Sequence, residues 1–202
     1  FMWRGMKCND VSFQPSAGFN AGGFTFFAWG TTDLNSFESQ ADSFLNYKYK
    51  GFKVQLANYF TTKKINGADV DVNYFDFKAH NTKHMFDALV SYTISKECPL
   101  TLTWSTIFAG ADYNADHSKR YYSSYFEVAY PFMVKDFNLQ AEIGFSPWEG
   151  MYTDSNKLNV VNIGLSLGKK LKITDSFSLP VFGKVVVNPA VEQTYFVFGL
   201  TI

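Results

Sequence analysis

Charged and tyrosine side chains recur at alternate positions of strand-like segments in this sequence. If the apolar parity of each segment faces outward, the opposite parity carries a set of ionisable groups into a shared interior: Arg4, Asp42, Lys48, Lys53, Asp87, Tyr125, Glu127, Glu142, Lys184 and Tyr195. Such a set could be a selectivity ring for a solute. It could equally be a network of ion pairs and hydrogen bonds, because buried charges are expected to be paired. Bulky aromatic residues on the same parity narrow any path and favour the network.

Two acids are central to this hypothesis. Glu127 and Glu142 lie on segments that are expected to pair, and two carboxylates side by side repel unless one finds a cation or a proton. Arg4 and Lys184 are the expected cations. We predict that these groups, with Asp87, Tyr125 and Tyr195, form a network across the interior of a barrel.

Histidine and cysteine offer no competing chemistry. A Ser-His hydrolase needs a histidine within reach of a serine and a third, orienting group, and no motif marks His80, His84 or His117 for that role. The spacing of His80 and His84 suits a metal only on a helix, which this segment does not resemble. We therefore expect no catalytic residue, no cofactor and no metal. Cys8 and Cys98 fall at opposite ends of the expected barrel, so we expect both thiols to be free.

The elements that would position these groups are long alternating strands. Residues 121–130 and 137–146 each alternate apolar with polar or small residues, and a short polar link joins them into a hairpin. Arms of about ten residues exceed the usual soluble strand of about five or six. They match the roughly nine to eleven residues with which a tilted strand crosses a bilayer.

The rest of the chain repeats this unit. Short turns near residues 21, 51, 97, 134 and 172 alternate with longer connections, the longest running from Thr62 to Lys83. This alternation is typical of an outer-membrane barrel. We predict one domain over residues 1–202, an all-β, transmembrane, antiparallel up-and-down β-barrel of about 12 strands. Its first strand would be Phe1–Lys7, and the even number would let the first and last strands pair antiparallel and close the sheet.

Composition agrees with this fold. The net charge is zero and no basic cluster suggests a nucleic-acid partner. A mean hydropathy of −0.11 is too low for a helical membrane protein but suits a barrel, in which every second residue meets lipid. Aromatic residues near strand ends are the expected membrane-interface belt: Trp3, Tyr49, Phe52, Tyr130, Phe132, Phe137 and Trp148. A soluble lipocalin-like barrel is the structural alternative, and it would bury the apolar parity inward.

Several short motifs resemble a largely uncharacterised family of Bacteroidetes outer-membrane β-barrels. The residues that carry the resemblance are Trp3-Arg4-Gly5, Ser91-Tyr92-Thr93, Pro99-Leu100-Thr101-Leu102, Pro131-Phe132, Pro147-Trp148, the run 173–180, Asn188-Pro189 and Phe196-Val197-Phe198-Gly199. The resemblance implies a barrel fold and a place in the bacterial outer membrane, and it implies little about activity.

Two functions follow as expectations. The first is a non-catalytic structural or accessory subunit of an outer-membrane protein assembly, favoured by the crowded interior and the lack of a catalytic motif. Its partners would be the lipid bilayer and other outer-membrane proteins. The alternative is a narrow, porin-like channel for small solutes.

Overall fold

The computed structural model describes residues 1–62 and 72–202, and its regular elements are strands with a single 3-10 turn, η1 (Pro189–Val191). Among these residues, no helix has the length and apolar character to cross a membrane. The strands are β1 (Met2–Trp3), β2 (Met6–Lys7), β3 (Ser12–Phe13), β4 (Ser16–Ala21), β5 (Phe24–Asp33), β6 (Ser39–Tyr49), β7 (Phe52–Thr62), β8 (His84–Thr93), β9 (Thr101–Gly110), β10 (Ser124–Val134), β11 (Phe137–Ser146), β12 (Asn159–Lys172), β13 (Ser178–Asn188) and β14 (Gln193–Leu200).

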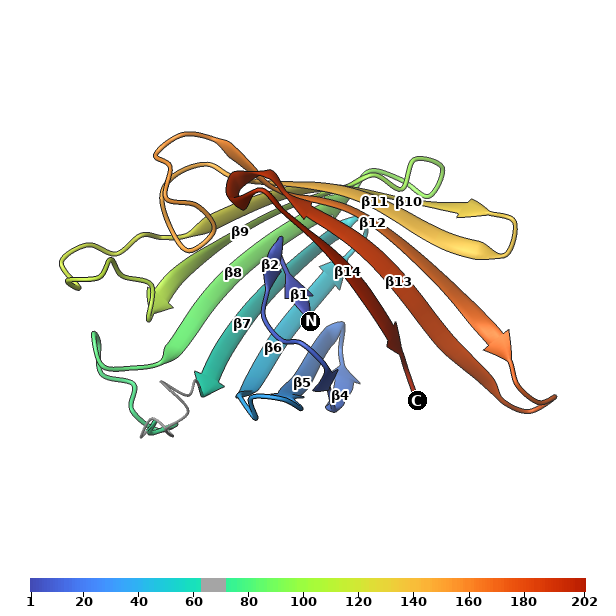
Figure 1. Ribbon diagram of the computed structural model, residues 1–202, viewed down its shortest axis with the longest axis horizontal. Helices are drawn as coiled ribbons and strands as arrows, with labels where there is room; N and C mark the ends of the chain where they lie inside the picture. The colour runs from blue at the N-terminus through green and yellow to red at the C-terminus, as the bar shows by residue number, and fades with distance from the viewer. Residues whose placement is uncertain (63–71) are drawn as a thin grey trace.

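One 12-stranded sheet contains β3 to β14, and from β4 onward every strand pairs antiparallel with the next strand in the chain (Figure 1). β3 and β4 are two short pieces, separated at Gln14-Pro15, that both pair with β5. The all-β, up-and-down, antiparallel arrangement predicted from the sequence is therefore confirmed. The hairpin predicted from residues 121–130 and 137–146 is also present: β10 and β11 pair from Phe126 opposite Phe145 to Val134 opposite Phe137.

The two ends of the sheet differ in their connections. Five short turns, which join β4–β5, β6–β7, β8–β9, β10–β11 and β12–β13, lie at one end, called here the turn end. The longer connections lie at the opposite, loop end. The expected long connection Thr62–Lys83 is at the loop end, and its residues 63–71 lie outside the described part of the chain.

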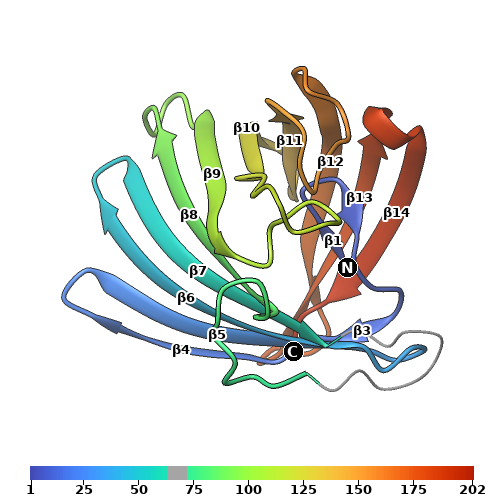
Figure 2. The same cartoon turned by 90° about the vertical axis from the view of Figure 1, so that its left-hand side faces the viewer.

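The first segment does not join the sheet, and here the prediction is wrong. Residues 1–7 fold back on themselves as the separate hairpin β1–β2, with Trp3 opposite Met6. The reason is local: Arg4 and Gly5 both have positive φ angles, of 50° and 83°, as a tight hairpin turn requires. Figure 2 shows the N-terminus and β1 on the concave side of the curved sheet.

The predicted antiparallel closure is absent as well. β3 and β4 form one edge of the sheet and β14 forms the other, with no pairing between these edges among the described residues. Ten successive antiparallel pairings lead from β4 to β14. The two edge strands therefore run in the same direction. Removing Phe1–Lys7 from the sheet causes this change. Because β3 and β4 both pair with β5 and count as one position, the 12-stranded sheet has an odd number of strands from edge to edge.

The distribution of side chains is the reverse of a soluble protein. Large apolar residues are exposed at alternate positions of the strands, including Leu56 at 49%, Leu165 at 47% and Phe198 at 82% exposed. Polar side chains are buried at the intervening positions, for example Asp87, Ser105 and Asn162. The apolar parity is thus on the outside, and the lipocalin-like alternative, which needs it inside, does not fit this structure.

Candidate functional site

The turn of the hairpin β1–β2 brings Arg4 into the concave side of the sheet. A Cβ atom at Gly5 would collide with the backbone carbonyl of Val161 on β12, so only glycine fits beside Arg4. The Gly5 carbonyl accepts a hydrogen bond from Asn188 Nδ2 of β13 at 3.1 Å. The turn is therefore fixed against β12 and β13.

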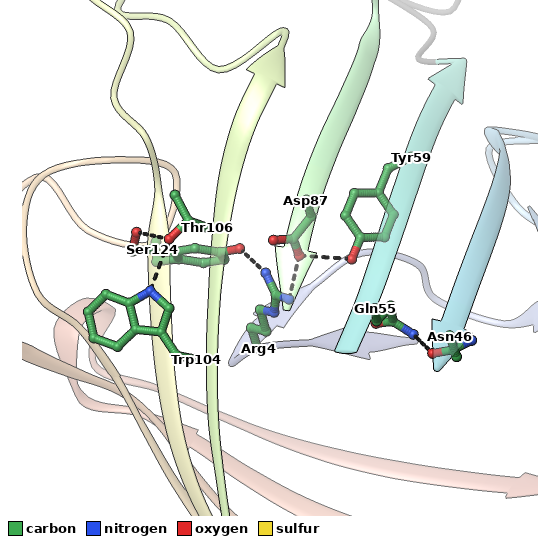
Figure 3. A network of polar contacts seen from close by, with 9 residues as sticks. Arg4, Asn46, Gln55, Tyr59, Asp87, Trp104, Thr106 and Ser124 are labelled. Atoms are coloured by element: carbon green, nitrogen blue, oxygen red, sulfur yellow. Dashed lines mark hydrogen bonds and ion pairs between the residues drawn. The ribbon is translucent and has the colours of Figure 1, made fainter. Parts of the chain in front are cut away.

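The turn lies against β12 and β13, and the Arg4 guanidinium reaches from there to β8, several strands away in the sheet. Its Nη2 atom lies 2.6 Å from Asp87 Oδ2, and its Nη1 atom donates to the Tyr152 hydroxyl at 2.6 Å. The two charged side chains are 8% and 1% exposed. Figure 3 shows Arg4 directed at Asp87, with Tyr59 reaching the same carboxylate from β7. The pair thus links the hairpin to strands in the middle of the sheet.

Aromatic rings surround the Arg4 guanidinium. Its central carbon lies 4.6 Å from the ring centre of Trp3 and 5.4 Å from that of Tyr125. Trp3 in turn packs edge-on against Tyr59, with the ring centres 5.1 Å apart. Cation–π contacts strengthen when water is excluded, as it is from this pair. Tyr125, Tyr152 and Val161 also form the buried apolar cluster of the fold, so the hairpin packs against its core.

A second cluster lies beside the first and is centred on Glu142 of β11. Its Oε1 atom accepts from Lys184 Nζ at 2.6 Å and from Asn162 Nδ2 at 2.8 Å. Its Oε2 atom accepts from Gln140 Nε2 at 3.2 Å. The carboxylate is therefore paired with a cation and hydrogen-bonded through both oxygens, as a buried charge requires.

Tyr125 joins the two clusters. Its hydroxyl donates to Glu127 Oε2 at 2.6 Å and accepts from Asn162 Nδ2 at 3.0 Å. The two acids expected to compete are thus satisfied differently, Glu142 by Lys184 and Glu127 by the tyrosine. One connected set of side chains thus crosses the concave side from the hairpin to β8, β10, β11, β12 and β13. We refer to this set as the cross-brace; its members are Arg4, Asp87, Tyr125, Glu127, Glu142, Tyr152, Asn162 and Lys184.

Two glycines make room for the cross-brace, and the sequence analysis did not single them out. A Cβ atom at Gly164 would lie 2.6 Å from Glu142 Cγ, and one at Gly144 would overlap the Tyr125 hydroxyl. Both sit directly opposite the acids in register, Gly144 with Glu127 and Gly164 with Glu142. A glycine at a non-turn position of a strand, facing a long polar side chain on the next strand, was the available signal.

Six of the ten expected interior residues meet, and four do not. Arg4, Asp87, Tyr125, Glu127, Glu142 and Lys184 belong to the cross-brace. Tyr195, opposite Val186 in the outer pair of strands, makes no side-chain hydrogen bond within the described residues. Of the remaining charges on this parity, Asp42 accepts from the Gln40 amide, while Lys48 and Lys53 lie opposite each other near the turn end.

The expected interface aromatics divide in the same way. Tyr49, Phe52, Tyr130 and Trp148 are exposed, and Phe132 and Phe137 are half-buried. Trp3 differs from the expectation: it packs inside, against Tyr59 and Tyr152, because the hairpin carries it to the concave side.

The histidines and cysteines have other surroundings. His84 is buried, with its two ring nitrogens against Asn58 Oδ1 at 2.8 Å and the Tyr74 carbonyl at 2.7 Å. His80 and His117 flank Tyr113 at the loop end. Within the described residues no group of three His, Cys, Asp or Glu side chains could hold a metal ion. Cys8 and Cys98 are free thiols.

Burial raises the pKa of two groups at the loop end. It raises the pKa of the Tyr152 phenol to about 12, so the hydroxyl stays protonated while it accepts from Arg4. Burial also raises the pKa of the Cys8 thiol to about 11, which makes that thiol a poor nucleophile at neutral pH.

This arrangement can hold parts of the sheet together and can obstruct a passage, since Arg4 and Lys184 are paired with Asp87 and Glu142. Comparison of the chain with family models, with curated proteins and with solved structures gave no match. The geometry therefore carries the functional argument alone.

Proposed function

We propose that this chain is an integral β-barrel of the bacterial outer membrane, in the role of a non-catalytic structural or accessory subunit of an outer-membrane protein assembly. The observation that carries the proposal is the inverted side-chain pattern, with apolar residues exposed on the convex face and charges paired on the concave face. That pattern suits a sheet with lipid outside and a polar lumen inside.

Strand length supports the same proposal. The strands from β5 to β13 contain ten to fourteen residues each, enough for a tilted strand to cross the bilayer core. Exposed Tyr49, Phe52 and Tyr92 at the turn end, with Trp148 at the loop end, suit the two interfacial aromatic girdles of such a barrel.

Closure of the barrel belongs to the proposal. In lipid, unpaired backbone groups along β4 and β14 would each cost several kcal/mol. Because the two edges run in the same direction, they would close the sheet by parallel pairing. Cysteines placed along β4 and β14, in a background that lacks Cys8 and Cys98, would form disulfides within one chain if this closure occurs.

The cross-brace favours a structural role over conduction. In a closed barrel its side chains, together with the hairpin β1–β2, would occupy the lumen that a solute has to cross. The deciding experiment is paired: bilayer conductance and unfolding stability are measured for the unmodified protein and for Glu142→Ala and Lys184→Ala. An occluded barrel gives no conductance before mutation and loses stability in both variants. Steady conductance, with ion selectivity altered by Glu142→Ala at unchanged stability, would overturn the structural role.

A narrow, porin-like channel for small solutes is the second candidate, and one observation favours it. Lys48 and Lys53 lie directly opposite each other on the lumenal parity near the turn end, and neither has a carboxylate partner among the described residues. Two such cations would attract anions at the mouth of a pore. In that case the unmodified protein would pass anions, and Lys48→Gln/Lys53→Gln would reduce its preference for them.

Co-purification from native membranes would identify the partner proteins of the structural role.

A further inference from the structure

The charges of the chain are segregated between the two ends of the sheet. The turn-end segments, residues 20–24, 47–54, 94–101, 133–138 and 168–178, contain eight lysines and three acids. Their net charge is +5. The chain as a whole is neutral, with 18 basic and 18 acidic residues, so all other segments together carry −5. Composition alone conceals this asymmetry, and the strand topology reveals it.

The lysines are spread along the turn end from the β6–β7 turn to the β12–β13 turn. Three of the short turns and the end of β12 supply exposed lysines that make no ion pair within the described residues: Lys50, Lys96, Lys135 and Lys170. Lys169 and Lys172 use nearby acids, Asp136 and Asp175, both at 2.6 Å. Successive hairpins are two strands apart, about 10 Å along the edge. The unpaired charges therefore form a row.

Exposed aromatic rings accompany the row on the convex face. Tyr49 and Phe52 are more than half exposed on either side of the Lys50 turn, and the Lys50 ammonium lies 5.2 Å from the Tyr49 ring centre. The Lys169 ammonium lies 4.6 Å from the Phe137 ring centre. An amphipathic tyrosine ring beside a cationic side chain, as at Tyr49 and Lys50, is the pattern of a membrane–water interface. A surface for a soluble acidic partner would not need outward-facing rings at the same level.

We propose that the turn end binds anionic phospholipid headgroups of the adjacent leaflet through the row formed by Lys50, Lys96, Lys135 and Lys170. The inference rests on the proposed membrane location and adds a lipid preference to it. Lysines near an anionic leaflet are attracted to it by a field that falls off within a Debye length. Salt should therefore weaken the effect.

The test compares three forms of the full chain refolded into two kinds of vesicle. One kind contains phosphatidylcholine alone, and the other contains phosphatidylcholine mixed with phosphatidylglycerol, whose anionic headgroups give the surface a negative potential. The forms are the unmodified protein, a turn-end variant (Lys50→Gln, Lys96→Gln, Lys135→Gln, Lys170→Gln) and a loop-end control (Lys78→Gln, Lys83→Gln, Lys119→Gln, Lys157→Gln). The readout is the thermal midpoint of unfolding. Samples are heated to a series of temperatures, and the folded fraction of each is then measured on a gel loaded without further heating.

Phosphatidylglycerol should raise the midpoint of the unmodified protein and of the loop-end control by about 4 °C or more. The turn-end variant should show less than half of that rise, and 0.5 M NaCl should abolish it in the unmodified protein. A rise of equal size in all three forms, or none in the unmodified protein, would overturn the proposal. If the turn-end variant does not fold, the salt series on the unmodified protein decides alone. Failure of the unmodified protein to insert into either vesicle would instead contradict the membrane location itself.

Discussion

Arg4 and Asp87 are 83 residues apart in the chain, yet their side chains form a buried ion pair at 2.6 Å. Arg4 belongs to a hairpin that makes no backbone pairing with the large sheet, and Asp87 lies in the middle of β8. Together with the Gly5–Asn188 hydrogen bond, the pair fixes a short N-terminal hairpin between distant strands. A few polar contacts therefore hold this hairpin in place, together with the packing of Trp3 against Tyr59 and Tyr152.

Loss of one partner should be costly. We expect Arg4→Met to lower the free energy of unfolding by roughly 3–5 kcal/mol, because it leaves the Asp87 carboxylate buried without a cation. The double variant Arg4→Met/Asp87→Leu should recover part of that loss. Urea unfolding in detergent micelles gives the values. The matched control is Lys119→Met, which breaks the exposed Lys119–Glu149 pair and should cost less than about 1 kcal/mol. Equal losses for Arg4→Met and Lys119→Met would show that the buried pair is not special.

The space beside Glu142 gives a second expectation. A methyl group at Gly164 would press on the Glu142 side chain, so Gly164→Ala should destabilise the protein by about 1–3 kcal/mol. Gly168→Ala is the control on the same strand, since its nearest atom would lie 3.8 Å from the new Cβ. Shortening the neighbour in Gly164→Ala/Glu142→Asp should restore part of the stability. No difference between Gly164→Ala and Gly168→Ala would contradict the tight fit.

The sequence predicted the strands well because period-two alternation is a local signal that a two-faced sheet preserves. The β10–β11 hairpin and the positions of the short turns follow from it. The role of Phe1–Lys7 could not be recognised in the same way, since its alternation fits a strand and only Arg4-Gly5 marks the reversal. Parity also placed Arg4, Asp87, Glu142 and Lys184 on one face, but parity carries no information about partners. Arg4 pairs with Asp87 rather than with the glutamates because the hairpin turn carries it to β8.

The two thiols should differ in reactivity. Burial raises the pKa of Cys8 from 9.0 to about 11, whereas Cys98 lies exposed in the β8–β9 turn. At pH 8 iodoacetamide should modify Cys98 first, because only about one Cys8 thiol in a thousand is ionised at that pH. Labelling of Cys8 should accelerate as the pH approaches 11. Mass spectrometry of labelled peptides measures both rates, and equal rates at pH 8 would contradict the burial of Cys8.

The same thiol links stability to pH. A pKa that is higher in the folded state stabilises the protein below pH 9.0, and this contribution is lost as the pH rises through about 11. The unmodified protein should therefore lose more stability than Cys8→Ala between pH 9 and 11. The free energy of unfolding is measured against pH for both forms. If it falls equally in the two forms between pH 9 and 11, Cys8 has the same pKa in the folded and the unfolded chain.

Placing one arginine on either face of β11 tests the outward direction of the apolar parity. Ile143 lies on the apolar face, opposite Val128 and Ile163 on the neighbouring strands. Gln140 lies on the opposite face, where its amide donates to Glu142. On the proposed membrane-spanning fold Ile143 lies near mid-membrane, and Ile143→Arg should cost about 2–4 kcal/mol when the protein is unfolded from lipid vesicles. Gln140→Arg should cost much less, because its guanidinium can approach the Glu142 carboxylate within the lumen. Ile143→Lys should resemble Ile143→Arg if the loss reflects charge in lipid. Similar losses for Ile143→Arg and Gln140→Arg would contradict the assignment of the apolar face to lipid.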